Sequence, residues 1–373
     1  MSWMIPKVKL DRDQQKAIDR VLEEGNFFVK GEAGTGKSIV LAHAALLFKH
    51  ENTSANVCVL TYTNALVACL KEGLEEHEIN IDCMTFHKFM RLRGGKHYDL
   101  VFIDEAQDLE PEWCRKIQAK GDKFVLFGDF AQSIYGFNSD LVTEPELIEK
   151  FAVREVIELK VDYRLPKNIR ELVKTIYMDR EFHAVPWRLM SNAQIPLFRA
   201  DDWEAEMDFV IKRAMVEAVT GSPVAILFER KKRIFKFFHT LLDGKEDGKL
   251  KLEEVNDILK KHDIPFRFFG GGIGDFKEGD EKPLTYVMTW HSAKGLDFES
   301  VILPDIADSP CRCNPFYVAL SRARHKLTLT YSGKPNDQIE KAKQCKAVCV
   351  IAADRNSGRV GVTKNEPQQG MLF

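Results

Sequence analysis

The sequence has 373 residues, of which 45% are hydrophobic and 29% are charged, with a formal net charge of −2. This length and composition predict a globular protein of two or three domains that buries a sizeable core. The near balance of charge excludes a global basic field, so any binding of nucleic acid has to come from local patches.

The apolar runs and the cysteines indicate a cytoplasmic protein. No stretch approaches the length of a membrane span, and the N-terminal residues do not resemble a signal peptide, so we expect no contact with a membrane. The eight cysteines are scattered, as is typical of a reducing compartment. Two interpretations stay open for four of them, free thiols or a metal site, although their spacing fits no common zinc or cluster pattern: Cys311, Cys313, Cys345 and Cys349.

The first predicted elements surround a glycine-rich loop. Residues 26–29 are a short, apolar, β-prone run, and the residues from Ile39 to Lys49 keep apolar side chains at helical spacing. Between them, Gly31 to Ser38 fits the pattern G-x-x-x-x-G-K-S. A strand, a glycine loop and a helix follow one another in the order that a phosphate-binding loop needs, so the sequence predicts an ATP or GTP site.

Each fixed position of the loop has a physical use. The glycines let the backbone amides around Gly34, Thr35 and Gly36 turn inward toward phosphate oxygens, and the helix that follows points its positive end at the same place. Lys37 would reach the β- and γ-phosphates, and the Ser38 hydroxyl would hold Mg²⁺.

Strand-like runs then alternate with helical stretches along the chain. The first set of predicted strands is Phe27–Lys30, Val57–Thr61, Leu100–Ile103 and Phe124–Phe127. A second set follows, with helices such as Trp203–Val219 between its members: Val156–Leu159, Val224–Phe228, Leu284–Thr289, Val301–Leu303 and Leu327–Tyr331. These apolar runs lack strict alternation, which predicts parallel sheets that are buried on both faces. We interpret the glycine- and charge-rich segment from Leu242 to Lys282 as a connection.

An acidic pair follows the third predicted strand. Asp104 and Glu105 stand at its carboxyl end, in the same domain as the phosphate loop. In that place Asp104 would hold Mg²⁺, and Glu105 would orient and deprotonate an attacking water molecule.

At this point the chain resembles the superfamily 1 helicases of the UvrD/Rep type. The resemblance covers residues 10 to 331 and rests on the phosphate loop together with these segments, in this order: LDRDQQKAI (10–18), LTYTNALV (60–67), MTFH (84–87), DEAQD (104–108), GDFAQSIYGF (128–137), DYRLP (162–166), TWHSAKGLDF (289–298) and YVALSRAR (317–324). It implies an α/β fold of two RecA-like P-loop NTPase domains with parallel sheets and ATP in the cleft between them. We therefore expect a first domain over 1–150, a second over 151–340 and a C-terminal tail over 341–373.

The resemblance also implies roles around the nucleotide. Gln14 would contact the adenine edge, Tyr163 would stack on the adenine, and Asp297 would meet the ribose. Arg164 and Arg322, both expected from the second domain, would reach the γ-phosphate as arginine fingers. Gln132 would sense the same phosphate and couple it to DNA.

Single-stranded DNA would cross both domains. Tyr62, Tyr135 and Phe137 would stack on bases. The contacts expected with the DNA backbone are Thr63, Asn64, Thr85, His87 and His291. Basic clusters at Arg91–His97 and Arg230–Arg233 have two open interpretations, phosphate contact or a solvated face.

Several positions depart from the family. Ile39 stands where relatives usually carry an arginine near the base, Asp297 where glutamate is usual, and Asn138-Ser139 where Arg-Gly is usual. Only 19 positions separate Thr85 from Asp104, where relatives insert an accessory domain, and the second accessory domain is missing near residue 271. The resemblance therefore implies a motor reduced to two domains.

The last residues resemble a peptide that binds the bacterial sliding clamp. They carry a glutamine and two apolar side chains after a polar leash: Gln369, Leu372 and Phe373. A terminal apolar tag or a strand that packs on the fold stays an alternative.

Two functions of different classes fit these observations. The first is an ATP-dependent 3′→5′ translocase or helicase on single-stranded DNA, in repair, replication or phage-related DNA metabolism. The second is an ATP-switched module that binds DNA or a partner such as a nuclease or clamp, and that hydrolyses ATP without unwinding. RNA as the track is a third, less favoured possibility.

Overall fold

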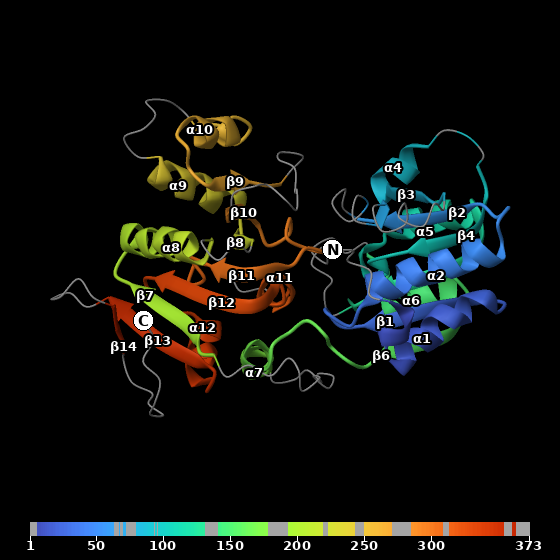
Figure 1. Cartoon of the computed structure of the whole chain (residues 1–373), viewed down its shortest axis with the longest axis horizontal. Coiled ribbons are helices and arrows are strands. Elements are labelled where there is room, and N and C mark those ends of the chain that lie inside the picture. The colour runs from blue at the N-terminus through green and yellow to red at the C-terminus, as the bar shows by residue number, and fades with distance from the viewer. Residues whose placement is uncertain are drawn as a thin grey trace. The chain divides into compact units, whose positions relative to one another are not determined.

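A computed structural model describes residues 6–62, 67, 70–71, 80–92, 94, 96–130, 141–177, 193–218, 223–242, 250–270, 285–308, 313–353 and 360–362. The chain divides into two compact units; the described part of unit 1 ends at Arg164, and unit 2 begins at Leu165. Each unit has its own sheet with helices packed on it (Figure 1). The predicted fold class, α/β with a parallel sheet in each of two domains, is confirmed.

Unit 1 contains a six-stranded, wholly parallel sheet in the order β3-β2-β4-β5-β1-β6. Its strands are β1 (Asn26–Gly31), β2 (Val57–Thr61), β3 (Asp82–Thr85), β4 (Tyr98–Ile103), β5 (Gly121–Gly128) and β6 (Val153–Leu159). Four of them, β1, β2, β4 and β5, match the predicted first set to within a few residues.

Helices cover both faces of this sheet. Within β1, Phe27 and Val29 pack in one cluster with α1 and α2, while Phe28 packs in the other with α4, α5 and α6. Successive side chains of a strand point to opposite faces, so an apolar run without alternation fills two cores at once. The described helices of this unit are α1 (Arg12–Asp19), α2 (Lys37–Glu51), α4 (Phe86–Arg91), α5 (Pro111–Gln118) and α6 (Glu144–Lys150), with 3₁₀ turns η1 (Lys7–Lys9), η2 (Arg20–Leu22) and η3 (Ala106–Asp108).

The predicted boundary at residue 150 was wrong. β6 is the edge strand of the first sheet and runs parallel to β1, with Phe28 opposite Val156 and Gly31 opposite Leu159. Ile157 and Leu159 are buried in the core that β1 shares with α1 and α2. These contacts hold the chain in unit 1 until Arg164.

Unit 2 contains an eight-stranded sheet in the order β14-β13-β7-β12-β11-β8-β10-β9. Only the β13–β14 pair is antiparallel among the described strands. Their bounds are β7 (Ile195–Ala200), β8 (Val224–Phe228), β9 (Phe266–Phe268), β10 (Thr285–Thr289), β11 (Phe298–Leu303), β12 (Ala323–Ser332), β13 (Val348–Ala353) and β14 (Val360–Val362).

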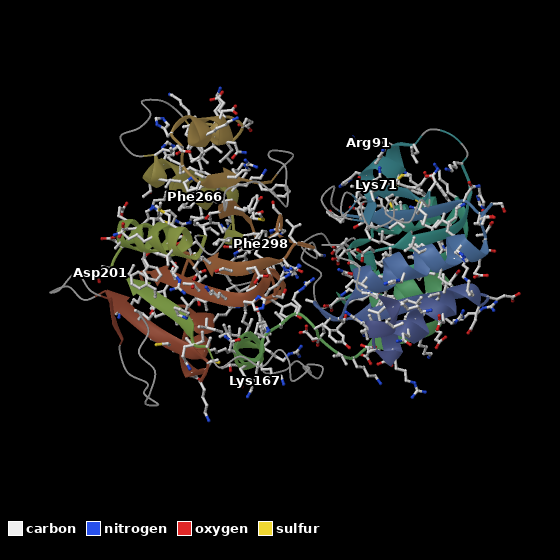
Figure 2. The ribbon with its side chains drawn as sticks, viewed as in Figure 1. Lys71, Arg91, Lys167, Asp201, Phe266 and Phe298 are labelled. Carbon is white, nitrogen blue, oxygen red and sulfur yellow. The ribbon has the colours of Figure 1, made fainter. Side chains whose placement is uncertain are left out.

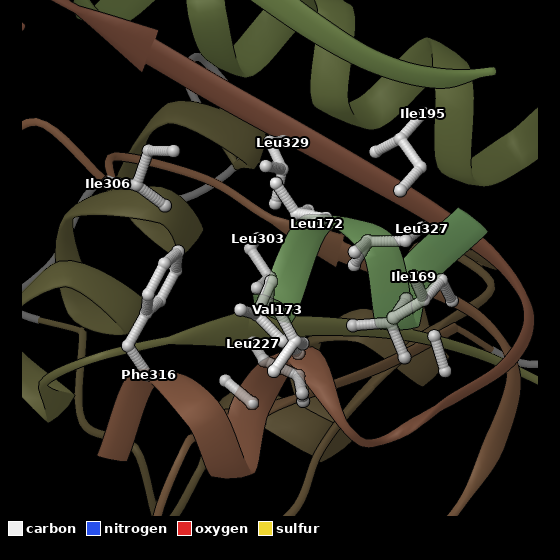
Figure 3. Close-up of a cluster of buried hydrophobic side chains, with 14 of the residues drawn as sticks. Ile169, Leu172, Val173, Ile195, Leu227, Leu303, Ile306, Phe316, Leu327 and Leu329 are labelled. Carbon is white, nitrogen blue, oxygen red and sulfur yellow. The ribbon is translucent and has the colours of Figure 1, made fainter. Parts of the chain in front are cut away.

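The second sheet is also covered on two faces. On one face Ile169, Leu172 and Val173 of α7 pack against Leu303 and Leu329 of the strands (Figure 3). On the other face α8, α9 and α10 pack against the alternate strand residues, such as Ile226 and Ile302. The described helices of this unit are α7 (Lys167–Ile176), α8 (Trp203–Ala218), α9 (Lys231–Leu241), α10 (Val255–Lys261), α11 (Cys313–Leu320) and α12 (Asp337–Gln344).

Two further expectations were wrong in unit 2. The stretch from 341 is not all tail, because β13 runs parallel to β7 within the sheet. The segment from Leu242 to Lys282 is more than a connection, because it contains α10 and the strand β9, whose Phe266 and Phe268 are buried. No helix in the described part of the chain is both long and apolar enough to cross a membrane.

Candidate nucleotide and nucleic-acid sites

The carboxyl ends of the unit 1 strands gather the predicted motifs at one edge of the sheet. β1 ends at Gly31, where the phosphate loop starts, and β4 ends at Ile103, just before Asp104. β6 ends at Leu159, three residues before the segment Asp162–Arg164. Because all six strands are parallel, these ends face the same way.

The phosphate loop turns tightly at two glycines. Gly34 and Gly36 have φ angles of 87° and 84°, a region that other residues rarely adopt. A Cβ on Gly34 would lie 2.2 Å from Oδ1 of Asp162, so a larger side chain has no room there. Gly36 is the N-cap of α2, so the first backbone N–H groups of this helix lack intrahelical partners and would bind phosphate oxygens as the sequence predicts.

The amine of Lys37 lies inside this loop. Its Nζ donates to the carbonyl oxygens of Gly31 at 2.6 Å and Glu32 at 3.0 Å. The hydroxyl of buried Thr35 also donates to the Glu32 carbonyl, at 2.8 Å. The loop is therefore closed by hydrogen bonds from its own side chains, Lys37 and Thr35. Ser38 follows in the first turn of α2.

The acidic pair follows β4, which is separated from β1 by β5 in the sheet. Asp104 is 2% exposed, and its Oδ1 accepts a hydrogen bond from the backbone N–H of Glu105 at 3.0 Å. Glu105 adopts a left-handed backbone with φ 54°, which is uncommon for a residue with a side chain and concentrates at functional sites. Its carboxylate accepts from Nε2 of Gln107, and Oε1 of Gln107 accepts from the Asp129 N–H at 3.0 Å. Gln107 thus fixes the Glu105 side chain to the end of β5.

The donor set suits Mg²⁺. The Ser38 hydroxyl and the Asp104 carboxylate are hard oxygen ligands, which this ion prefers together with water and phosphate oxygens. Among the described residues, no group of three or more His, Cys, Asp or Glu side chains could hold a metal ion. Cys345 and Cys349 are free thiols there, while Cys311 and the side chain of Cys313 lie outside the described residues.

The residues that are expected to contact the adenine base lie close to the phosphate loop. Nε2 of Gln14 donates to the Thr35 carbonyl at 2.9 Å, and the N–H of Tyr163 donates to the Gly34 carbonyl at 2.9 Å. The Tyr163 hydroxyl donates to Oδ2 of Asp11 at 2.7 Å. The structure therefore brings Gln14 and Tyr163 together around the loop, from segments almost 150 residues apart.

Arg164 differs from its expectation. It was expected in the second domain, but it is the last described residue of unit 1, and its N–H donates to Oδ1 of Asp162 at 2.8 Å. The physical reason is again the β6 strand, which keeps this segment on the first sheet.

The predicted residues of unit 2 have partners inside that unit. Arg322 is 1% exposed; its guanidinium donates to the carbonyls of Val318 at 2.9 Å and Leu296 at 3.2 Å, and to the Ser321 hydroxyl at 2.9 Å. Asp297 forms an ion pair with Arg324 at 3.2 Å.

His291 follows β10 and is half-buried. Burial, together with the neighbouring Lys294 cation, lowers the pKa of His291. The imidazole is therefore neutral near pH 7, and its contact with a DNA backbone would be a hydrogen bond rather than a charge pair.

Three residues expected at DNA meet at the ends of β2 and β3. The Tyr62 and His87 rings have centroids 6.0 Å apart, and the Thr85 hydroxyl accepts from the Lys88 N–H at the start of α4. Trp113 of α5 joins them, with its ring 5.1 Å from that of His87. Trp113 was not predicted as a member of this group, because α5 is distant in sequence from the MTFH segment. The two come together only through the order of the strands in the sheet.

The basic run from Arg91 to His97 does not form one surface among the described residues. Arg91 lies at the end of α4 (Figure 2). Lys96 and His97 precede β4 and lie at the amino ends of the strands, where they pair with Asp82 at 2.6 Å and Asp122 at 2.7 Å. In the second run, Arg233 pairs with Asp305 at 2.8 Å.

Several predicted site residues fall outside the described residues. They are Thr63, Asn64, Gln132, Tyr135, Phe137, Gln369, Leu372 and Phe373. Their roles stay predictions.

Two family models match the chain. The model described as an AAA domain matches residues 14–138, which hold the phosphate loop and the acidic pair. The model described as a UvrD-like helicase C-terminal domain matches residues 284–330, which run from β10 to β12.

The chain is similar in sequence to parts of several proteins that are named as helicases. The chain is 24% identical over 230 residues to the mitochondrial ATP-dependent DNA helicase HMI1 of Saccharomyces cerevisiae, covering 56% of this chain and 30% of that protein. It is 25% identical over 185 residues to the ATP-dependent DNA helicase PIF1 of Trypanosoma brucei brucei, covering 46% and 18%. It is 25% identical over 210 residues to an ATP-dependent helicase/nuclease subunit of Oenococcus oeni, covering 47% and 18%. The chain thus spans less than a third of each of these relatives.

Among solved structures, the arterivirus nonstructural protein 10 helicase aligns with 89% of this chain and 63% of its own, at a TM-score of 0.47 and 16% identity. The structure of that helicase with DNA aligns at a TM-score of 0.46 and 15% identity, over 89% and 65%.

Proposed function

We propose that this chain is a superfamily 1 helicase of the UvrD/Rep type, a DNA-stimulated ATPase that moves 3′→5′ along single-stranded DNA. Its matches to the two family models and its similarity to the helicases support this assignment. The observation that supports it most is the assembly at one edge of unit 1. The phosphate loop, the acidic pair and the Asp162–Arg164 segment follow three parallel strands and lie at the same edge of their sheet.

The chemistry of this edge fits ATP hydrolysis. The Lys37 ammonium and the amides at the start of α2 would bind the phosphates, and Ser38 and Asp104 would hold Mg²⁺. When bound, the ion neutralises charge that develops on the phosphate oxygens. Glu105, held by Gln107, would orient the attacking water and take its proton.

DNA as the track is supported by the aromatic group at the ends of β2 and β3. Tyr62, His87 and Trp113 offer ring faces and edges for bases, and base–aromatic stacking contributes about 1–3 kcal/mol per base. The 3′→5′ direction rests on the resemblance to the UvrD/Rep type. A repair or replication role is part of the same proposal.

Strand displacement tests the direction and the unwinding together. The substrates are duplexes with a 3′ or a 5′ single-stranded tail, and Glu105→Gln is the control that lacks the base. We expect ATP-dependent displacement from the 3′ tail alone. Displacement from the 5′ tail alone would contradict the direction, and equal displacement by Glu105→Gln would contradict the role of the site.

The second candidate is an ATP-switched module that binds DNA or a partner without unwinding. The described residues between Thr85 and Asp104 hold only α4 and β4, so nothing there matches the accessory domain that relatives insert. ATP hydrolysis that DNA stimulates, without displacement from either tail, would favour this candidate over the helicase.

We also propose that the tail binds a sliding clamp, through Gln369, Leu372 and Phe373. Deleting residues 369–373 should abolish clamp binding and leave ATP hydrolysis in the absence of clamp unchanged, because these residues are far in sequence from the nucleotide motifs. Surface plasmon resonance on immobilised clamp measures the first, and unaltered affinity would remove the proposal. Clamp tethering would raise the local concentration of DNA.

A further inference from the structure

The carboxylate of Asp11 forms hydrogen bonds with the two residues that are expected to contact the adenine base, Gln14 and Tyr163. Its Oδ1 accepts the N–H of Gln14 at 2.8 Å, and its Oδ2 accepts the hydroxyl of Tyr163 at 2.7 Å. The two oxygens of one side chain thus hold two segments that are 152 residues apart at the phosphate loop.

The first contact fixes Gln14. Asp11 is the N-cap of α1, and Oε1 of Gln14 accepts from the Asp11 N–H at 3.0 Å, which completes a reciprocal capping box. With Oε1 so occupied, the amide of Gln14 presents Nε2 to the Thr35 carbonyl, at 2.9 Å. Gln14 is 3% exposed, so the cap decides its orientation.

The second contact fixes Tyr163. The backbone of Tyr163 is bonded to the Gly34 carbonyl, and its hydroxyl is bonded to Asp11. These two bonds lie at opposite ends of the residue, so they fix the direction of the axis that runs from its backbone to its hydroxyl. Tyr163 also stands two residues before the chain passes into unit 2, so the same bonds anchor the end of unit 1.

We propose that Asp11 is a positioning residue that sets the base contacts of the nucleotide, by orienting Gln14 through the helix cap and the Tyr163 ring through the hydroxyl. This inference rests on the proposed function, because it assigns a purine nucleotide to the loop. Because the axis of the Tyr163 side chain is already fixed, a base that stacks on its ring loses less side-chain entropy on binding.

Two variants remove the bond between Asp11 and Tyr163 and keep the helix cap that orients Gln14. Tyr163→Phe keeps the ring and removes only the hydroxyl. Asp11→Ser keeps an N-cap, since serine caps helices as well as aspartate does, but it is too short to reach Tyr163. Both should raise the KM for ATP and the Ki of ADP roughly three- to tenfold, which corresponds to the net contribution of one ordinary hydrogen bond, with a smaller change in kcat.

A comparison of the inhibition constants of ADP and pyrophosphate distinguishes a positioning role of Asp11 from a merely structural one. Pyrophosphate binds the phosphate loop but has no base. If Asp11 positions the base contacts, the Ki of pyrophosphate stays within about twofold of that of the wild type in both variants. If the variants simply distort the loop, the two inhibition constants rise in parallel, which would overturn the inference.

The double variant gives a second check. If the two changes remove one shared bond, Asp11→Ser combined with Tyr163→Phe should weaken ADP binding no more than either change alone. Multiplying effects would contradict a shared bond.

Matched controls come from the same unit. Tyr98→Phe removes another tyrosine–aspartate bond, from Tyr98 to Asp82 at 3.0 Å, at the amino ends of the strands. Asp13→Ser removes a carboxylate from the first turn of the same helix. Neither should change the ratio of the ADP and pyrophosphate constants; a matching change would overturn the inference.

Equilibrium binding of a fluorescent ADP analogue, competed by ADP or pyrophosphate, keeps this test apart from the proposed function. If the wild type binds ADP but hydrolyses no ATP, the proposed ATPase fails while the positioning test still proceeds. If ADP binds no more tightly than pyrophosphate in the wild type, the chain has no base contact, and the inference falls.

Discussion

At the scale of the residue, the conformation of the phosphate loop requires a residue without a side chain at Gly34. Two features act together there: the φ of 87°, and the 2.2 Å that would separate a Cβ at this position from Oδ1 of Asp162. Gly333 has a similar φ of 80°, but a Cβ there would meet nothing within 4 Å. A comparison of substitutions at Gly34 and Gly333 therefore distinguishes the cost of backbone strain from the cost of a steric clash.

We therefore predict different costs for the two alanine substitutions. Gly333→Ala should lower the free energy of unfolding by about 1–2 kcal/mol, from the left-handed backbone alone. Gly34→Ala should lower it by roughly 3 kcal/mol or more, because Asp162 and Arg164 must also move. Chemical denaturation without nucleotide measures both, and equal losses would show that the segment after β6 does not press on the loop.

A second prediction at this scale concerns a buried acidic cluster in unit 2. Burial raises the pKa of Asp305 to about 6; the Arg233 cation opposes this, and the Glu206 carboxylate adds to it. Burial also raises the pKa of Glu206, which accepts from the Asp305 N–H at 2.7 Å and the Thr330 hydroxyl at 2.6 Å. The folded state thus holds protons on this cluster that the unfolded chain has released.

The sign follows from proton binding. Between the ordinary aspartate pKa and about 6, the folded state binds more protons, so the Asp305 contribution to stability is present at low pH and is lost as pH rises through 6. The difference in unfolding free energy between wild type and Asp305→Asn should fall by up to roughly 3 kcal/mol from pH 4 to pH 7. Urea unfolding at several pH values measures it; a constant or rising difference would contradict the prediction.

The site residues show how far sequence reasoning reaches. Lys37, Asp104 and Glu105 stand where the motif spacing predicted, because each follows a strand whose apolar run is unmistakable. Asp11 and Gln107 were not predicted as partners, since their contacts depend on the orientation of carboxylate and amide groups. The buried setting of Arg322 was missed as well, because an arginine is ordinarily exposed.

At the scale of the element, β6 decides where unit 1 ends. The strand was predicted from its apolar run, but its partner was not, because periodicity does not tell which sheet a strand joins. In the same way β3, β7 and β9 were missed: each is three to six residues long, and their polar or proline neighbours hide the apolar positions.

Fragments of unit 1 test this assignment. Residues 1–164 should unfold cooperatively, whereas residues 1–150 should not form a stable fold. The shorter fragment loses Ile157 and Leu159 from the core, about 2 kcal/mol each, and leaves β1 without a neighbour on one side. Circular dichroism during thermal unfolding distinguishes them, and equal cooperativity would place β6 outside the unit.

At the scale of the whole molecule, the candidate nucleotide site and the aromatic group of Tyr62, His87 and Trp113 both belong to the six-stranded sheet of unit 1. The phosphate loop follows β1 and the Tyr62–His87 pair follows β2 and β3, all at the carboxyl ends of parallel strands. Under the proposed function, we expect single-stranded DNA bound at one part of this edge to change the rate of ATP hydrolysis at another, through short segments such as α4 and the Asp104–Asp108 turn.

Steady-state ATP hydrolysis, with and without single-stranded DNA, tests this claim most directly. We expect DNA to raise kcat of the wild type at least tenfold, and Lys37→Ala to lose at least a hundredfold under both conditions, because the phosphates lose their cation. Turnover that DNA does not change would contradict the coupling between the aromatic group and the nucleotide site. Wild-type turnover by Lys37→Ala would contradict the nucleotide site itself.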